Sequence, residues 1–90
     1  MQKIILEGEK MTSQKAVHGY LREQLTLPQY YGENLDALYD CLTADVKEKT
    51  IIFNHSEAAI AELGQYGRSL LTVFEEAAKQ NRQIHFFSNQ

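Results

Sequence analysis

Residues 27–43, LPQYYGENLDALYDCLT, contain the signals that decide how this chain folds. Pro28 and Gly32 bracket a connecting segment, 27–33, because both residue types favour turns over regular structure. Asn34 can cap a following helix through its side-chain oxygen. Apolar residues then recur at the spacing i, i+3, i+4 and i+7, which predicts a helix with one buried face. That face comprises Leu35, Leu38, Tyr39 and Leu42.

Two aspartates lie on a different face of the same predicted helix. Successive helical residues are rotated by about 100°, so Asp36 and Asp40 lie only about 40° apart, with Tyr39 on the border of the apolar face. The helix dipole favours an acid in the first turn, which could by itself explain Asp36. Asp40 lies beyond that turn, where Asp is a poor helix former and a like charge four residues earlier is destabilising. The pair is therefore expected to point outward, and helix stability does not explain why both aspartates are present.

The connecting segment is unusually aromatic for a loop, because it holds Tyr30 and Tyr31. We expect these two tyrosines to be exposed. Exposed aromatic residues in a loop are typical of binding sites. The segment is therefore a candidate binding loop next to the two aspartates.

The flanking sequence alternates between short β-rich runs and helical stripes. An aliphatic run, 3–7, ends at Gly8 and predicts a buried strand. Thr12 or Ser13 can cap a helix that extends through Leu25. On the C-terminal side, Ser56 can cap a short helix that Gly64 ends. The elements expected there are a strand at 50–53, the short helix, a longer helix at 68–80 and a strand at 84–87.

This order, β-α-α-β-α-α-β, separates each strand from the next by helices, which is how parallel strands must be connected. The prediction is therefore a small α/β protein with a three-stranded parallel sheet and about four helices. A two-layer arrangement fits so short a chain at least as well as helices on both faces of the sheet. Ninety residues without a visible linker or repeat predict one domain spanning residues 1–90.

The acidity of the chain is local. The formal net charge is −3, yet residues 33–48 hold five acids and one lysine and so carry −4, which leaves +1 for the rest. A patch of one sign attracts basic partners and repels nucleic acid phosphates, so direct nucleic acid binding is disfavoured. The alternative is a solvated helix face with a chance excess of charge.

The remaining reactive groups do not suggest an enzyme. Cys41 is the only cysteine, which excludes an internal disulfide, fits a reducing compartment and is better explained as a small buried residue than as a nucleophile. His18, His55 and His85 are scattered without the spacing of a zinc site, so structural or solvated roles are expected. The apolar run at 4–6 is too short for a signal peptide or a membrane span, and we expect a cytoplasmic protein.

Two carboxylates at i, i+4 could form an acid–base pair, a metal site or an anionic recognition surface. A glycosidase-type pair must face across a substrate cleft, which neighbours on one exposed helix do poorly. A Mg²⁺ or Ca²⁺ site needs further oxygen ligands, for which Glu33 or Glu76 is available, but no metal-binding loop is present. The recognition surface is favoured, and a metal-assisted hydrolase using Asp36, Asp40 and Glu76 is the enzyme alternative.

Residues 27–43 resemble the signature segment of the barstar family of ribonuclease inhibitors, because a Tyr-Tyr-Gly turn, an Asn cap and two helical aspartates coincide. Weaker similarity extends along the whole chain, including VFEEA at 73–77. The resemblance implies a barstar-like fold, with neighbouring strands in sequential order. It also implies a cytoplasmic protein that is not an enzyme, needs no cofactor or metal, and forms a 1:1 complex with a basic, extracellular-type ribonuclease such as barnase.

The resemblance further implies a role for each residue of the binding surface. Asp40 would enter the phosphate-binding site of the ribonuclease and Asp36 would form a second ion pair, so that carboxylates take the positions of RNA phosphates. Val73 and Glu76 would add a flank from the long helix. The remaining partner-binding residues would be Tyr30, Asn34, Leu35, Tyr39, Thr43 and Ala44.

Three residues depart from the best-known member of the family. Tyr39 stands where that protein has Trp, Ala44 where it has Gly, and Gln80 where it has Glu. The same mode of inhibition is expected, while the preferred ribonuclease is left open. A barstar-like domain that binds another basic toxin or enzyme is the alternative.

Overall fold

A computed structural model describes residues 2–90 and confirms the predicted succession of strands and helices, β-α-α-β-α-α-β. The structure also contains a single 3-10 turn after the first strand, which was not predicted. The elements are β1 (Gln2–Glu7), η1 (Gly8–Lys10), α1 (Gln14–Leu25), α2 (Leu35–Ala44), β2 (Lys49–Asn54), α3 (Ser56–Leu63), α4 (Gln65–Gln80) and β3 (Ile84–Ser88).

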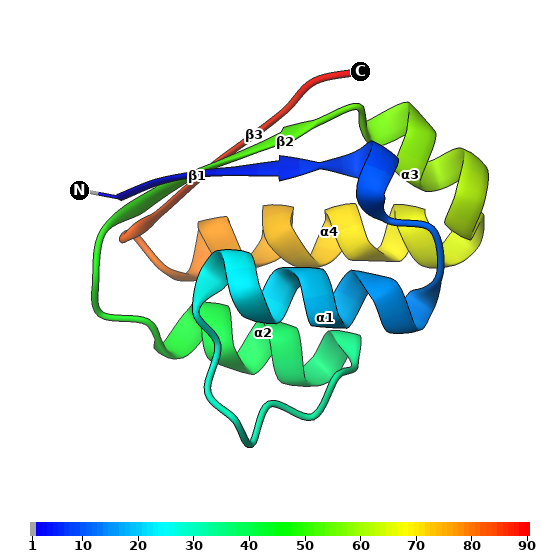
Figure 1. The fold of residues 1–90 in the computed structure, drawn as a ribbon. Helices are drawn as coiled ribbons and strands as arrows, with labels where there is room; N and C mark the ends of the chain where they lie inside the picture. Colours follow the sequence, from blue (N-terminus) through cyan, green and yellow to red (C-terminus); the bar gives the residue numbers. More distant parts are fainter. Residues whose placement is uncertain (1) are drawn as a thin grey trace.

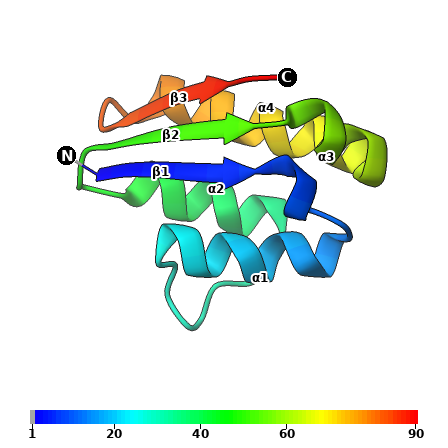
Figure 2. The ribbon, with the colours of Figure 1, turned by 45° about the horizontal axis from the view of Figure 1, so that its top comes forward.

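The three strands form one parallel sheet in the order β1-β2-β3, which confirms the α/β class. Side chains alternate between the two faces of a sheet. Leu6 of β1 and Ile51 and Phe53 of β2 are fully buried on one face, whereas Ile5 is exposed on the other. Helices α1, α2 and α4 all lie on the buried side, and α3 lies beyond the carboxyl ends of the strands (Figures 1 and 2). The helices therefore cover one face of the sheet and not both.

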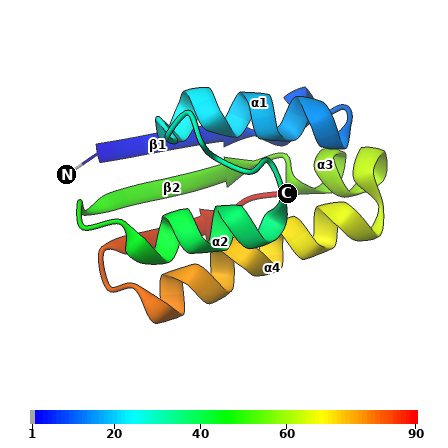
Figure 3. The ribbon, with the colours of Figure 1, turned by 90° about the horizontal axis from the view of Figure 1, so that it is seen from below.

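The helices are stacked at two depths beneath the sheet. α1 packs under β1 and α4 under β3, while α2 lies between these two helices on the side away from the sheet (Figures 1 and 3). Leu38 and Leu42 are the buried residues of α2 and reach the common core. The opposite side of α2 is consequently left to solvent. Across residues 2–90, no helix combines the length and the apolar character needed to cross a membrane.

The predicted helix caps are right for α1 and wrong for α3. Ser13 caps α1, since its Oγ accepts a hydrogen bond from the N–H of Ala16 at 3.1 Å. Ser56 is instead the first residue of α3, and His55 holds the cap position in the left-handed region, with φ of 55°. The Ser56 N–H donates to the carbonyl of Asn89 at 2.9 Å. A contact with the distant C-terminal end of the chain thus replaces the local cap.

Helix α4 begins at Gln65, earlier than the predicted start at Arg68. Gly64 is the only residue between α3 and α4, and it adopts φ of 60°, which glycine reaches without steric cost. A Cβ atom on Gly67 would lie 3.0 Å from the carbonyl oxygen of Ala59. Two glycines therefore let the chain reverse and the second helix start immediately, close against the first.

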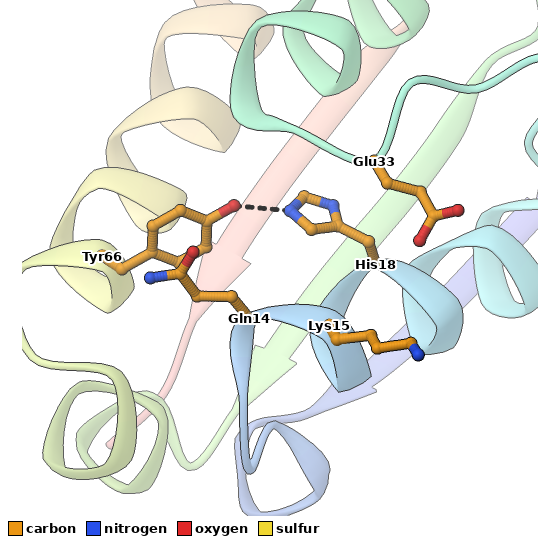
Figure 4. Close-up of a pocket in the computed structure, with 5 residues that line it drawn as sticks. All are labelled: Gln14, Lys15, His18, Glu33 and Tyr66. Atoms are coloured by element: carbon orange, nitrogen blue, oxygen red, sulfur yellow. Dashed lines mark hydrogen bonds between the residues drawn. The ribbon is translucent and has the colours of Figure 1, made fainter.

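A buried histidine ties α1 to the connecting segment and to α4. His18 is only 2% exposed, and its Nδ1 lies 2.6 Å from the Tyr31 hydroxyl while its Nε2 lies 2.5 Å from the Tyr66 hydroxyl. Figure 4 shows the ring pointing toward Tyr66, beside a hollow that Glu33 also lines. A neutral imidazole donates through one nitrogen and accepts through the other, so it satisfies both hydroxyls at once.

The two tyrosines of the connecting segment differ in their surroundings. Tyr30 is 88% exposed, as expected, whereas Tyr31 is only 4% exposed, so its predicted exposure is wrong. The reason is the hydrogen bond to His18, together with a backbone hydrogen bond from the Tyr31 N–H to the Pro28 carbonyl at 3.0 Å. One tyrosine anchors the segment in the core, and the other is left on the surface.

The titration of His18 predicts a loss of stability in mild acid. Burial lowers the pKa of His18 in the folded chain, so the unfolded chain takes up this proton first as the pH falls. The contribution of neutral His18 to the free energy of unfolding is fully present above the unfolded pKa of about 6.5. Below that pH it is lost at up to about 1.4 kcal/mol per pH unit. Urea unfolding from pH 8 to 5 should show this loss relative to His18→Gln. A difference in the free energy of unfolding between the two proteins that stays constant over this pH range would contradict the prediction.

The left-handed residue at the end of α1 predicts a stabilising substitution. Thr26, the C-cap of α1, has φ of 52°, an unfavourable conformation for a β-branched residue. Thr26→Gly should raise the free energy of unfolding by about 0.5 to 1 kcal/mol, after allowance for the greater freedom of glycine in the unfolded chain. Thr26→Ala keeps the Cβ atom and should not match that gain in urea unfolding. If alanine stabilises as much as glycine, backbone strain is not the cause.

Candidate functional site

The solvent-facing side of α2 carries the two predicted aspartates. Asp36 and Asp40 are both exposed and lie away from the buried residues Leu38 and Leu42. Within residues 2–90, neither carboxylate takes part in an ion pair or a side-chain hydrogen bond. Two like charges thus stand one helical turn apart without internal compensation.

The other acids in 33–48 are paired within the chain. Glu33 accepts a hydrogen bond from Arg22 at 2.8 Å, and Glu48 lies 2.8 Å from Nε2 of His85. Asp45 forms an ion pair with Lys49, whose side chain is almost fully buried at the start of β2. Of the acids in the patch predicted from the charge count, only the two aspartates of α2 therefore lack an internal partner in the described chain.

Both ends of α2 are held by asparagine side chains. Asn34 is the predicted cap: its Oδ1 accepts from the Ala37 N–H at 2.7 Å, and its Nδ2 donates to the Gly32 carbonyl at 3.2 Å. At the other end, buried Asn81 follows α4 and donates to the carbonyls of Leu42 and Asp45, each at 2.8 Å. Asn81 was not predicted, because only the folded chain brings it to the end of α2. The pair fixes the direction in which the aspartates project.

Residues around the aspartates offer contact area of mixed character. Tyr39 and Leu35 are half-buried and pack against the core, while Asn34 and Ala44 are exposed. The Thr43 hydroxyl donates to the Tyr39 carbonyl at 2.8 Å and so is already satisfied within the helix. These predicted contact residues all lie on α2 or at its start, which places them on one continuous element.

The exposed Tyr30 borders a shallow pocket next to α2. Its other lining residues include Pro28, Cys41 and Ala44. Cys41 is half-buried, and burial, followed by the charge of Asp40, raises the pKa of its thiol. A thiol kept protonated is a poor nucleophile, which agrees with the expected packing role of Cys41.

Helix α4 runs beside α2 and supplies a second edge (Figure 3). Val73 is half-buried against the core, and Glu76 is exposed and forms an ion pair with Lys79 at 3.0 Å. Gln80 at the end of α4 is also exposed. Val73 and Glu76 therefore lie on the helix beside α2, and Lys79 offsets part of the negative charge of Glu76.

The geometry gives no support to a catalytic metal site on this surface. In the described part of the chain, Asp36, Asp40 and Glu76 do not form a group of three ligands whose atoms all lie within 4.8 Å of one another. Both aspartates instead project from one exposed helix that is held rigidly at its ends. Such an arrangement can form ion pairs with a partner that supplies the cations.

Comparison with known proteins agrees with this picture. Residues 1–89 match the family described as Barstar (barnase inhibitor). The chain is also 38% identical over 81 residues, which is 89% of each chain, to the Bacillus subtilis (strain 168) protein named "Putative ribonuclease inhibitor YrdF". Both similarities extend over nearly the whole length of the chain. We conclude that the chain belongs to the barstar family.

Proposed function

We propose that this protein inhibits a barnase-type ribonuclease by covering the enzyme's active site with α2 and segment 27–33. The observation that carries the proposal is the pair of exposed aspartates, Asp36 and Asp40, which lack internal partners in the described chain. Membership of the barstar family supports the target class. One inhibitor binds one enzyme inside the producing cell, without turnover or cofactor.

Unpaired carboxylates suit this role because binding breaks no ion pair within the inhibitor. A ribonuclease must hold RNA phosphates with cationic groups, and carboxylates placed among those groups form short, charge-assisted hydrogen bonds. Taking two charges out of water is costly, so the complex gains stability only where the partner's cations are already in position. Asn34 and Asn81 hold α2 in place beforehand, which limits the ordering cost of association.

The neighbouring side chains complete the contact around the two charges. Tyr30 offers a large aromatic surface with few rotatable bonds to immobilise. Thr43 and Ala44 are small and let the enzyme approach the helix backbone closely. On α4, Val73 and Glu76 form the outer edge of the contact. The surface thus combines a charged centre with an aromatic and aliphatic border.

Truncation of the aspartates tests this proposal. Asp40→Ala should raise the inhibition constant for a barnase-type ribonuclease by about 100-fold, because loss of one partner from a desolvated ion pair costs about 3 kcal/mol. Asp36→Ala should act in the same direction. The measurement is a titration of inhibitor into the active enzyme with a fluorogenic RNA substrate.

A matched control is Glu62→Ala, which removes an exposed acid from α3. It should leave the inhibition constant unchanged. Failure of the unmodified protein to inhibit would contradict the proposal, and so would an inhibition constant that neither aspartate variant raises above that of the unmodified protein. If a different basic protein binds the unmodified chain and loses affinity for Asp40→Ala, the proposed binding surface is supported and the proposed ribonuclease target is contradicted.

A further inference from the structure

Three potential metal ligands meet at the carboxyl ends of β1 and β2. Glu7, Glu9 and His55 each offer one ligand atom, and these three atoms lie within 4.8 Å of one another. Glu7 Oε2 is 2.8 Å from His55 Nδ1, and Glu9 Oε1 is 3.9 Å from the same nitrogen. Within residues 2–90 no other group of histidine, cysteine and acidic side chains is arranged in this way.

The backbone brings these side chains together from two elements and a connection between two others. Glu7 ends β1, Glu9 belongs to η1, and His55 joins β2 to α3; Figure 2 shows η1 turning beside the start of α3. A Cβ atom on Gly8 would lie 2.0 Å from the His55 carbonyl oxygen. Only glycine allows so close an approach of the two backbones, and this approach is what places Glu9 opposite the imidazole.

Supporting hydrogen bonds orient one of the carboxylates. Asn54 Nδ2 donates to Glu7 Oε1 at 3.2 Å, which leaves Oε2 directed at His55. Asn89 Nδ2 in turn donates to Asn54 Oδ1 at 2.9 Å. Partners of this kind fix ligand orientation in metal sites, and their loss typically weakens metal affinity.

The charge of the cluster is not balanced by its own members. Two carboxylates face one imidazole, so the cluster carries about one negative charge with a protonated histidine and two with a neutral one. Hydrogen bonds from His55 and Asn54 lower the pKa of Glu7, and the charge of Lys10 adds a smaller effect in the same direction. The hydrogen bond to Glu7 and the charge of Glu9 raise the pKa of His55. The hydrogen bond between His55 Nδ1 and the Glu7 carboxylate, at 2.8 Å, places its proton where a cation would be held.

We propose that Glu7, Glu9 and His55 form a binding site for a divalent transition-metal ion of the zinc class. An imidazole nitrogen and two carboxylate oxygens suit Zn²⁺, whereas Mg²⁺ and Ca²⁺ prefer oxygen ligands alone. Binding displaces the proton from His55 Nδ1, and water or a partner's side chain fills the remaining coordination position. None of the three residues belongs to the surface around Asp36 and Asp40, so the site is independent of ribonuclease inhibition.

Calorimetric titration of the full-length protein with Zn²⁺ at pH 7.5 tests the site. One saturable site is expected, and Zn²⁺ should raise the melting temperature. Glu9→Gln and His55→Asn should each weaken binding by at least about tenfold. Glu9 is largely exposed, and Asn tolerates the left-handed backbone of residue 55, so both variants should retain the fold.

Two controls separate this site from other zinc-binding groups. His85→Gln removes an imidazole that also pairs with a carboxylate, Glu48, at 2.8 Å but belongs to no ligand cluster in the described chain. Cys41→Ser removes the thiol. Neither should change the affinity.

The pH dependence gives a second readout. Because one proton competes with the ion, the affinity should fall by about tenfold per pH unit below the pKa of His55. Absence of saturable Zn²⁺ binding would overturn the proposal. So would an unchanged affinity in Glu9→Gln, or equal losses in His55→Asn and His85→Gln.

Discussion

The architecture depends on the parallel pairing of three neighbouring strands in sequential order. Each parallel connection must cross over one face of the sheet, and such crossovers share one hand. With the order β1-β2-β3, both connections therefore lie on the same face, where α1 and α4 cover the sheet. The first connection contains a second helix, α2, for which no place remains against the strands. It packs outside α1 and α4, and the rest of the chain leaves one side of it uncovered (Figure 1).

The position of α2 explains why its solvent side can carry two like charges. An outer helix is free to present residues that add nothing to the core, provided that its ends are fixed. Asn34 fixes one end and Asn81 the other, while His18 holds the preceding segment through Tyr31. The repulsion between the aspartates destabilises the helix only slightly compared with the stabilisation that these hydrogen bonds provide. The buried face of α2 thereby contributes to stability, while its solvent face is free for the recognition role that we propose.

Local signals in the sequence predict the helices and strands well, but they do not predict contacts between residues that are distant in the sequence. The apolar periodicity and the caps at Ser13 and Asn34 are local, and the structure confirms them. The burial of Tyr31 depends on His18 in another element, and the start of α3 depends on the C-terminal end of the chain, so both predictions failed. The roles of Asn81 and of the cluster around His55 arise in the same way. Each requires knowledge of which strand and helix ends meet.

The central claim is that Asp36 and Asp40 act as the charged centre of a partner-binding surface. The most direct test is the association rate constant with a barnase-type ribonuclease as a function of salt. Exposed charges are screened over about 10 Å at 0.1 M ionic strength, so a rate governed by these aspartates must fall as salt is added. The account predicts a steep fall for the unmodified protein and a much flatter one for the double variant Asp36→Asn, Asp40→Asn. Equal salt dependence in the two proteins would contradict it.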